Sequence, residues 1–367
     1  MTEPNRLHSL FAEQGQSPWL DNLRRSWIHN GELQAWLDKG VLGITSNPSI
    51  FQKAIEGSDD YTEQFQSLLA DGKSIEESYW GLVITDIEDA LALTRPIYDA
   101  TDGLDGYVSV EVDPGLARDE AGTEAAARQL WDTIDEPNVY IKIPGTAEGV
   151  PAIRQMTAEK RSINVTLLFS VERYRDVMEA YISGLEVAEG DLSAISSVAS
   201  FFISRVDVEV DKRLEAIGTD QALALRGKAA VANGKLAYAA FLDTFTGPRW
   251  EALTARGARV QRPLWASTST KNEAYPDTLY VDTLIGPDTV NTIPDATFDV
   301  FRDHGTVART LDADVDEART VIAEIAAMGI DIEEVAQQLE DEGVISFEKA
   351  FSTLINSLEI KAAELQA

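Results

Sequence analysis

The segment VYIKIP (Val139–Pro144) has the alternating pattern of a buried β-strand, in which apolar residues are interleaved with Tyr140 and Lys142. Seven further short runs rich in Val, Ile and Thr lie on either side of it, bounded by Gly, Pro, Asn or Asp. These runs are Ser17–Asp21, Val41–Ser46, Tyr107–Val112, Ile163–Phe169, Ala194–Phe202, Arg262–Ser267 and Val290–Pro294. The sequence therefore predicts eight short strands.

Amphipathic patterns between these runs predict helices. They cover Ser26–Lys39, Ile50–Leu69, Ile75–Tyr98, Ala117–Ile134, Ala147–Glu159, Val171–Ala188, Arg205–Ile217, Ala222–Leu253 and Phe298–Ile325. Strands that alternate with helices are parallel and joined by right-handed crossovers, so eight such units predict an α/β fold, a (β/α)8 TIM barrel. A doubly wound sheet is the alternative, but no Gly-rich phosphate loop follows either of the first two runs.

The tail from about Asp312 is acidic, and its apolar residues recur at helical spacing. We expect one domain over residues 1–367, with the barrel at about 17–327 and a C-terminal helical extension at about 328–367. Phe347, Phe351 and Leu354 form an apolar stripe in this extension. Either the stripe covers the barrel mouth and shields the site from water, or it packs on the barrel wall.

The composition of the chain excludes several classes of function. The 367 residues include 31 Lys and Arg against 62 Asp and Glu, a net charge of −31, which repels nucleic acid and anionic lipid. No apolar run is long enough to span a membrane, and the first twenty residues lack the pattern of a secretory signal, so we expect a cytoplasmic protein. The chain has no Cys and only three His, so we do not expect a metal site built from histidines. A monomer and a homodimer both remain open.

Lys142 is the most informative residue, because it shares a strand face with Tyr140 opposite the apolar residues. If the apolar face packs on helices, Lys142 points into the barrel, where a neutral amine is a nucleophile that forms Schiff bases with carbonyls. Glu111 is placed in the same way in YVSVEVD and suits a proton shuttle. The alternatives are an edge strand with Lys142 in water, and a plain structural ion pair for Glu111.

Other polar residues lie in or near the ends of the predicted strands, which in a barrel meet at one mouth. They are Asp21, Asn47, Asn164, Thr166, Ser200, Arg205, Ser267, Ser269 and Lys271. Asn164 and Thr166 suit a water or a substrate hydroxyl, although a threonine–backbone bond is as common. Arg205, Lys271 and Ser267 could bind a phosphate by charge-assisted hydrogen bonds, whereas the commoner fate of such an arginine is the surface of a helix.

Seven motifs resemble those of transaldolases in order and spacing. They are GITSNPSIF (Gly43–Phe51), VSVEVDP (Val108–Pro114), YIKIPGT (Tyr140–Thr146), NVTLLFS (Asn164–Ser170), SSVASFFISRVD (Ser196–Asp207), PLWASTSTKN (Pro263–Asn272) and YVDTLIGPDTVNTIPDAT (Tyr280–Thr297). The acidic tail resembles that of the longer bacterial members. The resemblance implies a class I aldolase-type barrel without a cofactor, which moves a dihydroxyacetone unit from sedoheptulose 7-phosphate to glyceraldehyde 3-phosphate.

The resemblance also implies roles for individual residues. Lys142 would form the Schiff base, and Asp21 would exchange the proton of the C4 hydroxyl. Glu111 would act through a water held by Thr166. Substrate hydroxyls would be bound by Asn47, Asn164 and Ser200, and the phosphate by Arg205 and Ser267.

One position departs from the family pattern. Many transaldolases have a phosphate-binding arginine where this chain has Ser269, so that either Lys271 substitutes for it or phosphate is bound more weakly. The nearest rival function is that of a fructose 6-phosphate aldolase, which resembles shorter chains with a tyrosine for proton transfer. A catalytically silent barrel and a sugar-phosphate isomerase barrel are more distant rivals, because fold alone does not fix function.

Overall fold

A computed structural model describes residues 5–365 as a closed barrel of eight strands. Each strand is parallel to its two neighbours, in the order of the sequence, and β8 closes the barrel by pairing with β1. The strands are β1 (Gln16–Leu20), β2 (Gly43–Thr45), β3 (Val108–Glu111), β4 (Val139–Pro144), β5 (Ile163–Leu168), β6 (Ser197–Phe202), β7 (Gln261–Ala266) and β8 (Thr289–Ile293). The predicted (β/α)8 TIM barrel is confirmed, and the doubly wound alternative is wrong because the sheet has no edge.

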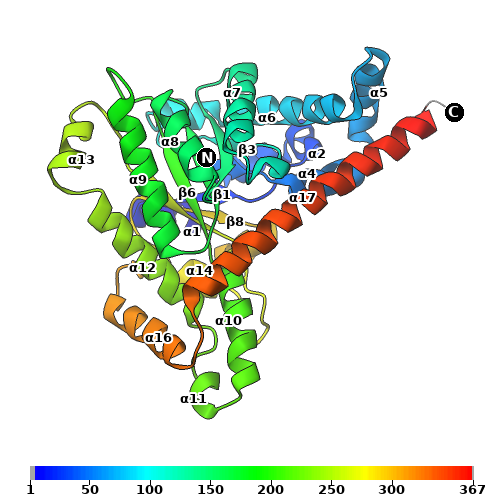
Figure 1. The fold of residues 1–367 in the computed structure, drawn as a ribbon. Coiled ribbons are helices and arrows are strands. Elements are labelled where there is room, and N and C mark those ends of the chain that lie inside the picture. Colours follow the sequence, from blue (N-terminus) through cyan, green and yellow to red (C-terminus); the bar gives the residue numbers. More distant parts are fainter. Residues whose placement is uncertain (1–4, 366–367) are drawn as a thin grey trace.

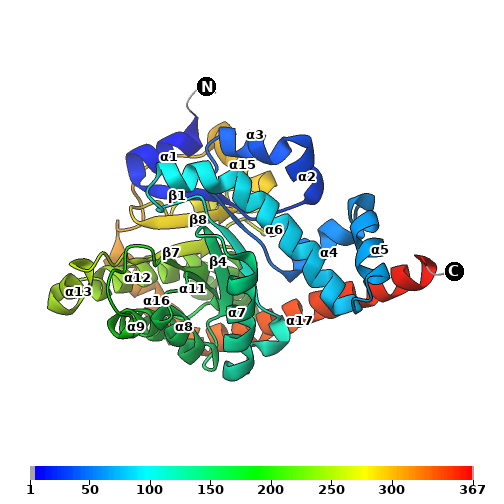
Figure 2. The same cartoon turned by 90° about the horizontal axis from the view of Figure 1, so that it is seen from above.

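Helices surround this barrel on the outside (Figure 2). They are α1 (Arg6–Gln14), α2 (Arg25–Asn30), α3 (Glu32–Asp38), α4 (Pro48–Glu56), α5 (Thr62–Ala70), α6 (Ile75–Ala100), α7 (Glu120–Ile134), α8 (Gly149–Ala158), α9 (Val171–Val187), α10 (Ser204–Ile217), α11 (Asp220–Leu223), α12 (Ala229–Thr244), α13 (Gly247–Thr254), α14 (Leu279–Asp282), α15 (Asp295–His304), α16 (Val315–Ala327) and α17 (Ile332–Leu365), with the short 3-10 helices η1 (Asp59–Tyr61) and η2 (Pro114–Leu116). Across residues 5–365, no helix has both the length and the apolar character to cross a membrane.

Four of the predicted helices are wrong, because the structure divides each of them into shorter helices. The helix predicted at Ser26–Lys39 divides into α2 and α3 at Gly31, whose φ is 84°. The pattern at Ile50–Leu69 is divided into α4, η1 and α5. The pattern at Ala222–Leu253 is divided into α11, α12 and α13, and the one at Phe298–Ile325 into α15 and α16. Apolar spacing continues across such breaks, because successive short helices pack on the same core.

The lower part of the barrel is filled by aromatic rings. Tyr107 and Tyr140 stack with their centroids 4.1 Å apart, and Trp19 lies 5.9 Å from Tyr140. Gly43 makes room for Trp19, since a Cβ there would lie 2.5 Å from the indole. A buried ion pair of 3.1 Å between Arg262 and Asp105 adjoins this layer. The rings form a rigid floor beneath the strand ends.

One strand deviates from regular geometry. The register between β5 and β6 shifts between Val165 and Leu168, and Leu167 has φ of 60°. This bulge follows Thr166 directly, and the side chain of Leu167 meets α17, where a Cβ on Gly343 would lie 2.8 Å from its Cδ2. Gly343 therefore lets a helix from the end of the chain approach the mouth of the barrel closely.

The predicted extension contains a single helix, α17, which is 34 residues long. It runs from the side of α10 past η2 and along α4 and α6 to α5 (Figure 1). Residues 1–4 and 366–367, which the predicted domain range 1–367 includes, lie outside the described residues.

Candidate active site

A cavity of about 160 Å³ opens at the carboxyl ends of the strands. Eight of the ten predicted site residues line it: Asp21, Asn47, Lys142, Thr166, Ser200, Arg205, Ser267 and Lys271. The other two, Glu111 and Asn164, are buried and contact residues of this lining. The structure thus brings together residues as far apart in the sequence as Asp21 and Lys271.

Lys142 lies inside the barrel with 4% of its surface exposed, so the alternative of an edge strand is wrong. Its Nζ is 3.2 Å from a carboxylate oxygen of Glu111, the residue opposite it on β3, and donates to the Ser46 carbonyl at 3.2 Å. Burial raises the pKa of Glu111, and the nearby Lys142 ammonium opposes this rise. Glu111 is therefore a stronger base than an exposed glutamate, and it lies beside the Lys142 ammonium.

Asp21 follows β1 directly and faces the same cavity. Its Oδ1 accepts a 2.9 Å hydrogen bond from Thr45, whose hydroxyl is also 2.5 Å from that of Thr292. Burial raises the pKa of Asp21, while Lys142, the Thr45 hydrogen bond and Arg205 pull it down. Because its pKa is raised, Asp21 binds a proton more readily than an exposed aspartate does.

A chain of hydrogen bonds fixes the polar groups of β3, β5 and β6. Ser200 donates to Asn164 at 2.7 Å, and Asn164 donates to Ser109 at 3.0 Å. Thr166 differs, because its buried hydroxyl has no hydrogen-bond partner anywhere in residues 5–365. The alternative of a threonine–backbone bond is therefore wrong, and Thr166 presents an unused hydroxyl to the cavity.

Positive charge gathers at the opposite side of the mouth. Arg205 begins the helix after β6 and stacks over Phe202 at 5.1 Å, so it is not an ordinary helix-surface arginine. Ser267 has φ of 58°, a strained conformation that turns it towards α10, where its hydroxyl is 2.9 Å from that of Ser204. Lys271 donates to Ser269 at 2.5 Å, and both line the cavity.

The pKa of Lys271 is lowered by partial desolvation of its ammonium and by the charge of Arg205, although the residue as a whole is exposed. Two cations held side by side repel each other, and an anion between them relieves this repulsion. The pair formed by Arg205 and Lys271 is thus suited to a phosphate.

Several lining residues escaped the sequence analysis. Thr45, Thr292 and Phe202 read as ordinary strand residues, and Ser49 as a residue of the first helical turn of α4. Phe347 was singled out only as part of the apolar stripe of the tail. In the structure its ring lies 5.9 Å from the Lys142 Nζ and lines the cavity. Within residues 5–365, no group of three or more His, Cys, Asp or Glu side chains is arranged to hold a metal ion.

This arrangement defines a class of active site, in which a buried lysine and two carboxylates open onto a cavity with a cationic rim. It suits covalent chemistry on the carbonyl of an anionic substrate. Comparison with known proteins points the same way, because a family model described as "Transaldolase/Fructose-6-phosphate aldolase" matches residues 18–358. The chain belongs to this family.

Full-length relatives carry the more specific of these two names. A transaldolase of Thermobifida fusca is 50% identical over 351 residues, which are 94% of this chain and 95% of the relative. A transaldolase of Parafrankia is 49% identical over 353 residues, 95% of this chain and 96% of the relative. Transaldolase 1 of Streptomyces avermitilis is 48% identical over 365 residues, 98% and 97% of the two chains. The resemblance to transaldolases that the motifs indicate is confirmed.

Proposed function

We propose that this chain is a transaldolase, a transferase that moves a dihydroxyacetone unit from sedoheptulose 7-phosphate to glyceraldehyde 3-phosphate. The products are erythrose 4-phosphate and fructose 6-phosphate, as in the non-oxidative pentose phosphate pathway of the cytoplasm. The observation that carries the proposal is the position of Lys142, buried 3.2 Å from Glu111 in a cavity that Asp21 also lines. The protein acts as a monomer or a homodimer, without a cofactor.

Covalent bonding begins at Lys142. Its neutral Nζ attacks the C2 carbonyl of the ketose after giving a proton to Glu111, which lies close enough to receive it. The carbinolamine then loses its oxygen as water and leaves a protonated imine. Glu111 returns the proton through a water that Thr166 orients, a role supported by the unused hydroxyl of Thr166.

Cleavage depends on Asp21. Its carboxylate takes the proton of the C4 hydroxyl, the C3–C4 bond breaks, and the electron pair moves into the protonated imine to give an enamine. The aldose product leaves, and C3 of the enamine attacks the aldehyde of the acceptor. Asp21 then returns its proton to the new hydroxyl, and water hydrolyses the imine to free Lys142.

Substrate binding uses the rest of the lining. Asn47, Asn164 and Ser200 bind hydroxyls of the sugar, while Arg205, Ser267 and Lys271 bind the phosphate. The alternative is a fructose 6-phosphate aldolase, which releases dihydroxyacetone instead of transferring it. Asp21, held by Thr45 at the mouth, favours the transferase, since the resemblance assigns a tyrosine to proton transfer in the aldolase.

Borohydride trapping with fructose 6-phosphate tests the proposal. We expect a reduced dihydroxyacetone adduct on the peptide that contains Lys142, and erythrose 4-phosphate added before the borohydride should deplete it. Lys142→Ala should abolish the adduct, whereas Lys349→Ala, on the exposed face of α17, should keep it. Folded protein without an adduct would refute the Schiff-base mechanism, and an adduct that the acceptor does not deplete would favour the aldolase.

A further inference from the structure

Helix α17 covers the mouth of the barrel and adds an apolar residue to the candidate active site. Phe347 is buried and lines the cavity beside Lys142. Phe351, one turn further on, packs edge-on against Tyr79 of α6 at 5.2 Å, and Leu354 is fully buried. Phe347 thus faces the site, whereas Phe351 packs on the surrounding helices.

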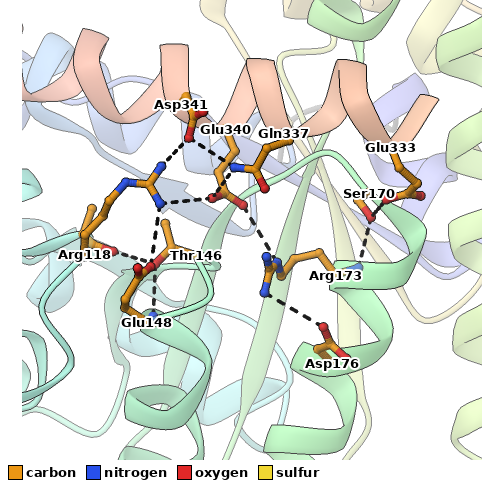
Figure 3. Close-up of polar contacts among 12 residues, drawn as sticks. Arg118, Thr146, Glu148, Ser170, Arg173, Asp176, Glu333, Gln337, Glu340 and Asp341 are labelled. Atoms are coloured by element: carbon orange, nitrogen blue, oxygen red, sulfur yellow. Dashed lines mark hydrogen bonds and ion pairs between the residues drawn. The ribbon is translucent and has the colours of Figure 1, made fainter. Parts of the chain in front are cut away.

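A buried carboxylate lies on the same face of the helix. Glu340 precedes Phe347 by seven residues, which is two helical turns, and only 5% of it is exposed. Its two oxygens lie 3.8 Å from Arg118 and 3.8 Å from Arg173, and Gln337 donates to one of them at 3.2 Å (Figure 3). Glu340 is therefore held between two arginines that come from different parts of the barrel.

These arginines belong to the segments that follow two catalytic strands. Arg118 lies between η2 and α7, after the strand that carries Glu111, and it also pairs with Asp341 and with Glu148. Arg173 lies in the first turn of α9, after the strand that carries Thr166. Figure 3 shows both side chains reaching up to α17 from below. One carboxylate thus joins the covering helix to the ends of two βα units.

Apolar residues of the helix lie beside this anchor, because Leu339 and Val344 are buried in the hydrophobic core and Gly343 contacts Leu167. Glu340 adds a charged contact to this packing, and Ser170 donates a hydrogen bond to Glu333 nearer the start of the helix. Loss of the Glu340 charge would leave Arg173 facing a neutral side chain, whereas Arg118 would keep Asp341 as a partner on the same helix. Removal of one partner from a buried polar contact costs more free energy than the contact contributes, because the other partner is left without compensation.

We infer that Glu340 is a positioning residue, which holds α17 so that Phe347 shields the lysine-bound enamine from water. The inference rests on the proposed function. If water reaches C3, it supplies a proton there, the enamine becomes an imine again, and hydrolysis frees dihydroxyacetone and Lys142. If water is kept out, C3 waits for the acceptor aldehyde and transfer follows. Glu340 would in this way influence the choice between transfer and release without touching the substrate.

The ratio of dihydroxyacetone release to transfer tests this inference. Fructose 6-phosphate is the donor and erythrose 4-phosphate the acceptor, and free dihydroxyacetone is measured beside sedoheptulose 7-phosphate. Glu340→Gln keeps the size of the side chain and removes its charge, and Phe347→Ala removes the shield itself. We expect each to raise the ratio by about tenfold, which corresponds to about 1.4 kcal/mol of difference between the two barriers. Glu359→Gln, on the exposed surface of the same helix, should leave the ratio unchanged.

An unchanged ratio in folded Glu340→Gln would overturn the inference, even if Phe347→Ala raised it. If Glu340→Gln does not fold, Arg118→Gln removes one partner from the half-exposed side of the contact. It should then raise the ratio in the same direction, and a ratio equal to that of the parent would also overturn the inference. Failure of the proposed function is distinguishable, because the parent protein would then give no adduct on Lys142.

Discussion

Replacement of Gly343 by alanine probes the closest approach of α17 to the barrel. A methyl group at this position would lie 2.8 Å from Cδ2 of Leu167 and 3.7 Å from Nη1 of Arg205. Carbon atoms pack at about 3.5–4.0 Å, so either the end of the Leu167 side chain must turn away or helix and strand must separate by about 1 Å. Leu167 is 1% exposed, so rotation of its side chain would displace other packed atoms.

Two effects of opposite sign set the size of the change. Alanine favours a helix interior over glycine by about 1 kcal/mol. Overpacking against Leu167 costs about 1–3 kcal/mol. We therefore expect Gly343→Ala to lower the free energy of unfolding by about 0–2 kcal/mol. Phe347 lies one turn further along the helix, so a shift of about 1 Å should also lower kcat/KM for transfer by about tenfold or more.

Chemical denaturation and steady-state kinetics of the same preparation check both parts. Ser346→Ala is a suitable control, because it changes helix propensity on the exposed face without touching the barrel. If Gly343→Ala were more stable than the parent by about 1 kcal/mol and transferred at the parent rate, the reasoning would be refuted. Helix propensity alone would then account for the change, and the short distance to Leu167 would carry no cost.

Three further predictions concern charge. Lys271→Ala should raise KM for fructose 6-phosphate about fivefold, since a charge-assisted hydrogen bond at an exposed site contributes about 1 kcal/mol, and an unchanged KM would refute its role. Asp21→Asn should lower kcat by about 10²-fold or more. Because burial raises the pKa of Asp21, kcat/KM of the parent should fall on acidification through a pH above the ordinary value of 3.8, a limb that a pH–rate profile of Asp21→Asn should lack. Burial raises the pKa of Asp207 to about 6, so its contribution to stability is present at low pH and is lost as pH rises through about 6. Asp207→Asn can still accept a hydrogen bond from the Ala230 N–H and pair with the Tyr280 hydroxyl. Between pH 4 and pH 7, its free energy of unfolding should rise relative to that of the parent by up to about 3 kcal/mol, which denaturation measures.

The sequence is sufficient to predict the barrel, because buried strands have a recognisable pattern of apolar residues. No observed strand begins more than one residue before its predicted run. The strands β1, β7 and β8 begin one residue before theirs. Lys142 and Glu111 were found because a charged residue in an apolar strand is conspicuous. The register confirms that the two are neighbours, with Glu111 directly opposite Lys142.

The residues and features that the sequence does not predict lack such a pattern. Thr45 and Thr292 are common strand residues, and only the closure of β1 between β2 and β8 brings both to Asp21. The bulge at Leu167 breaks the two-residue period that a strand prediction assumes. The stripe of α17 fits both alternatives, because helical spacing defines a face but not its partner.

The order of elements along the chain also has a consequence for biosynthesis. Gln16 pairs with Thr289, so the first strand must wait for the last before the barrel can close. Such distant pairing is slow, because the entropy of a long loop is lost before the contact is gained. A ribosome makes Asp21, Glu111 and Lys142 well before it makes Glu340 and Phe347. A nascent chain that has not yet reached α17 therefore contains these three residues without Phe347, the residue of α17 that lines the cavity.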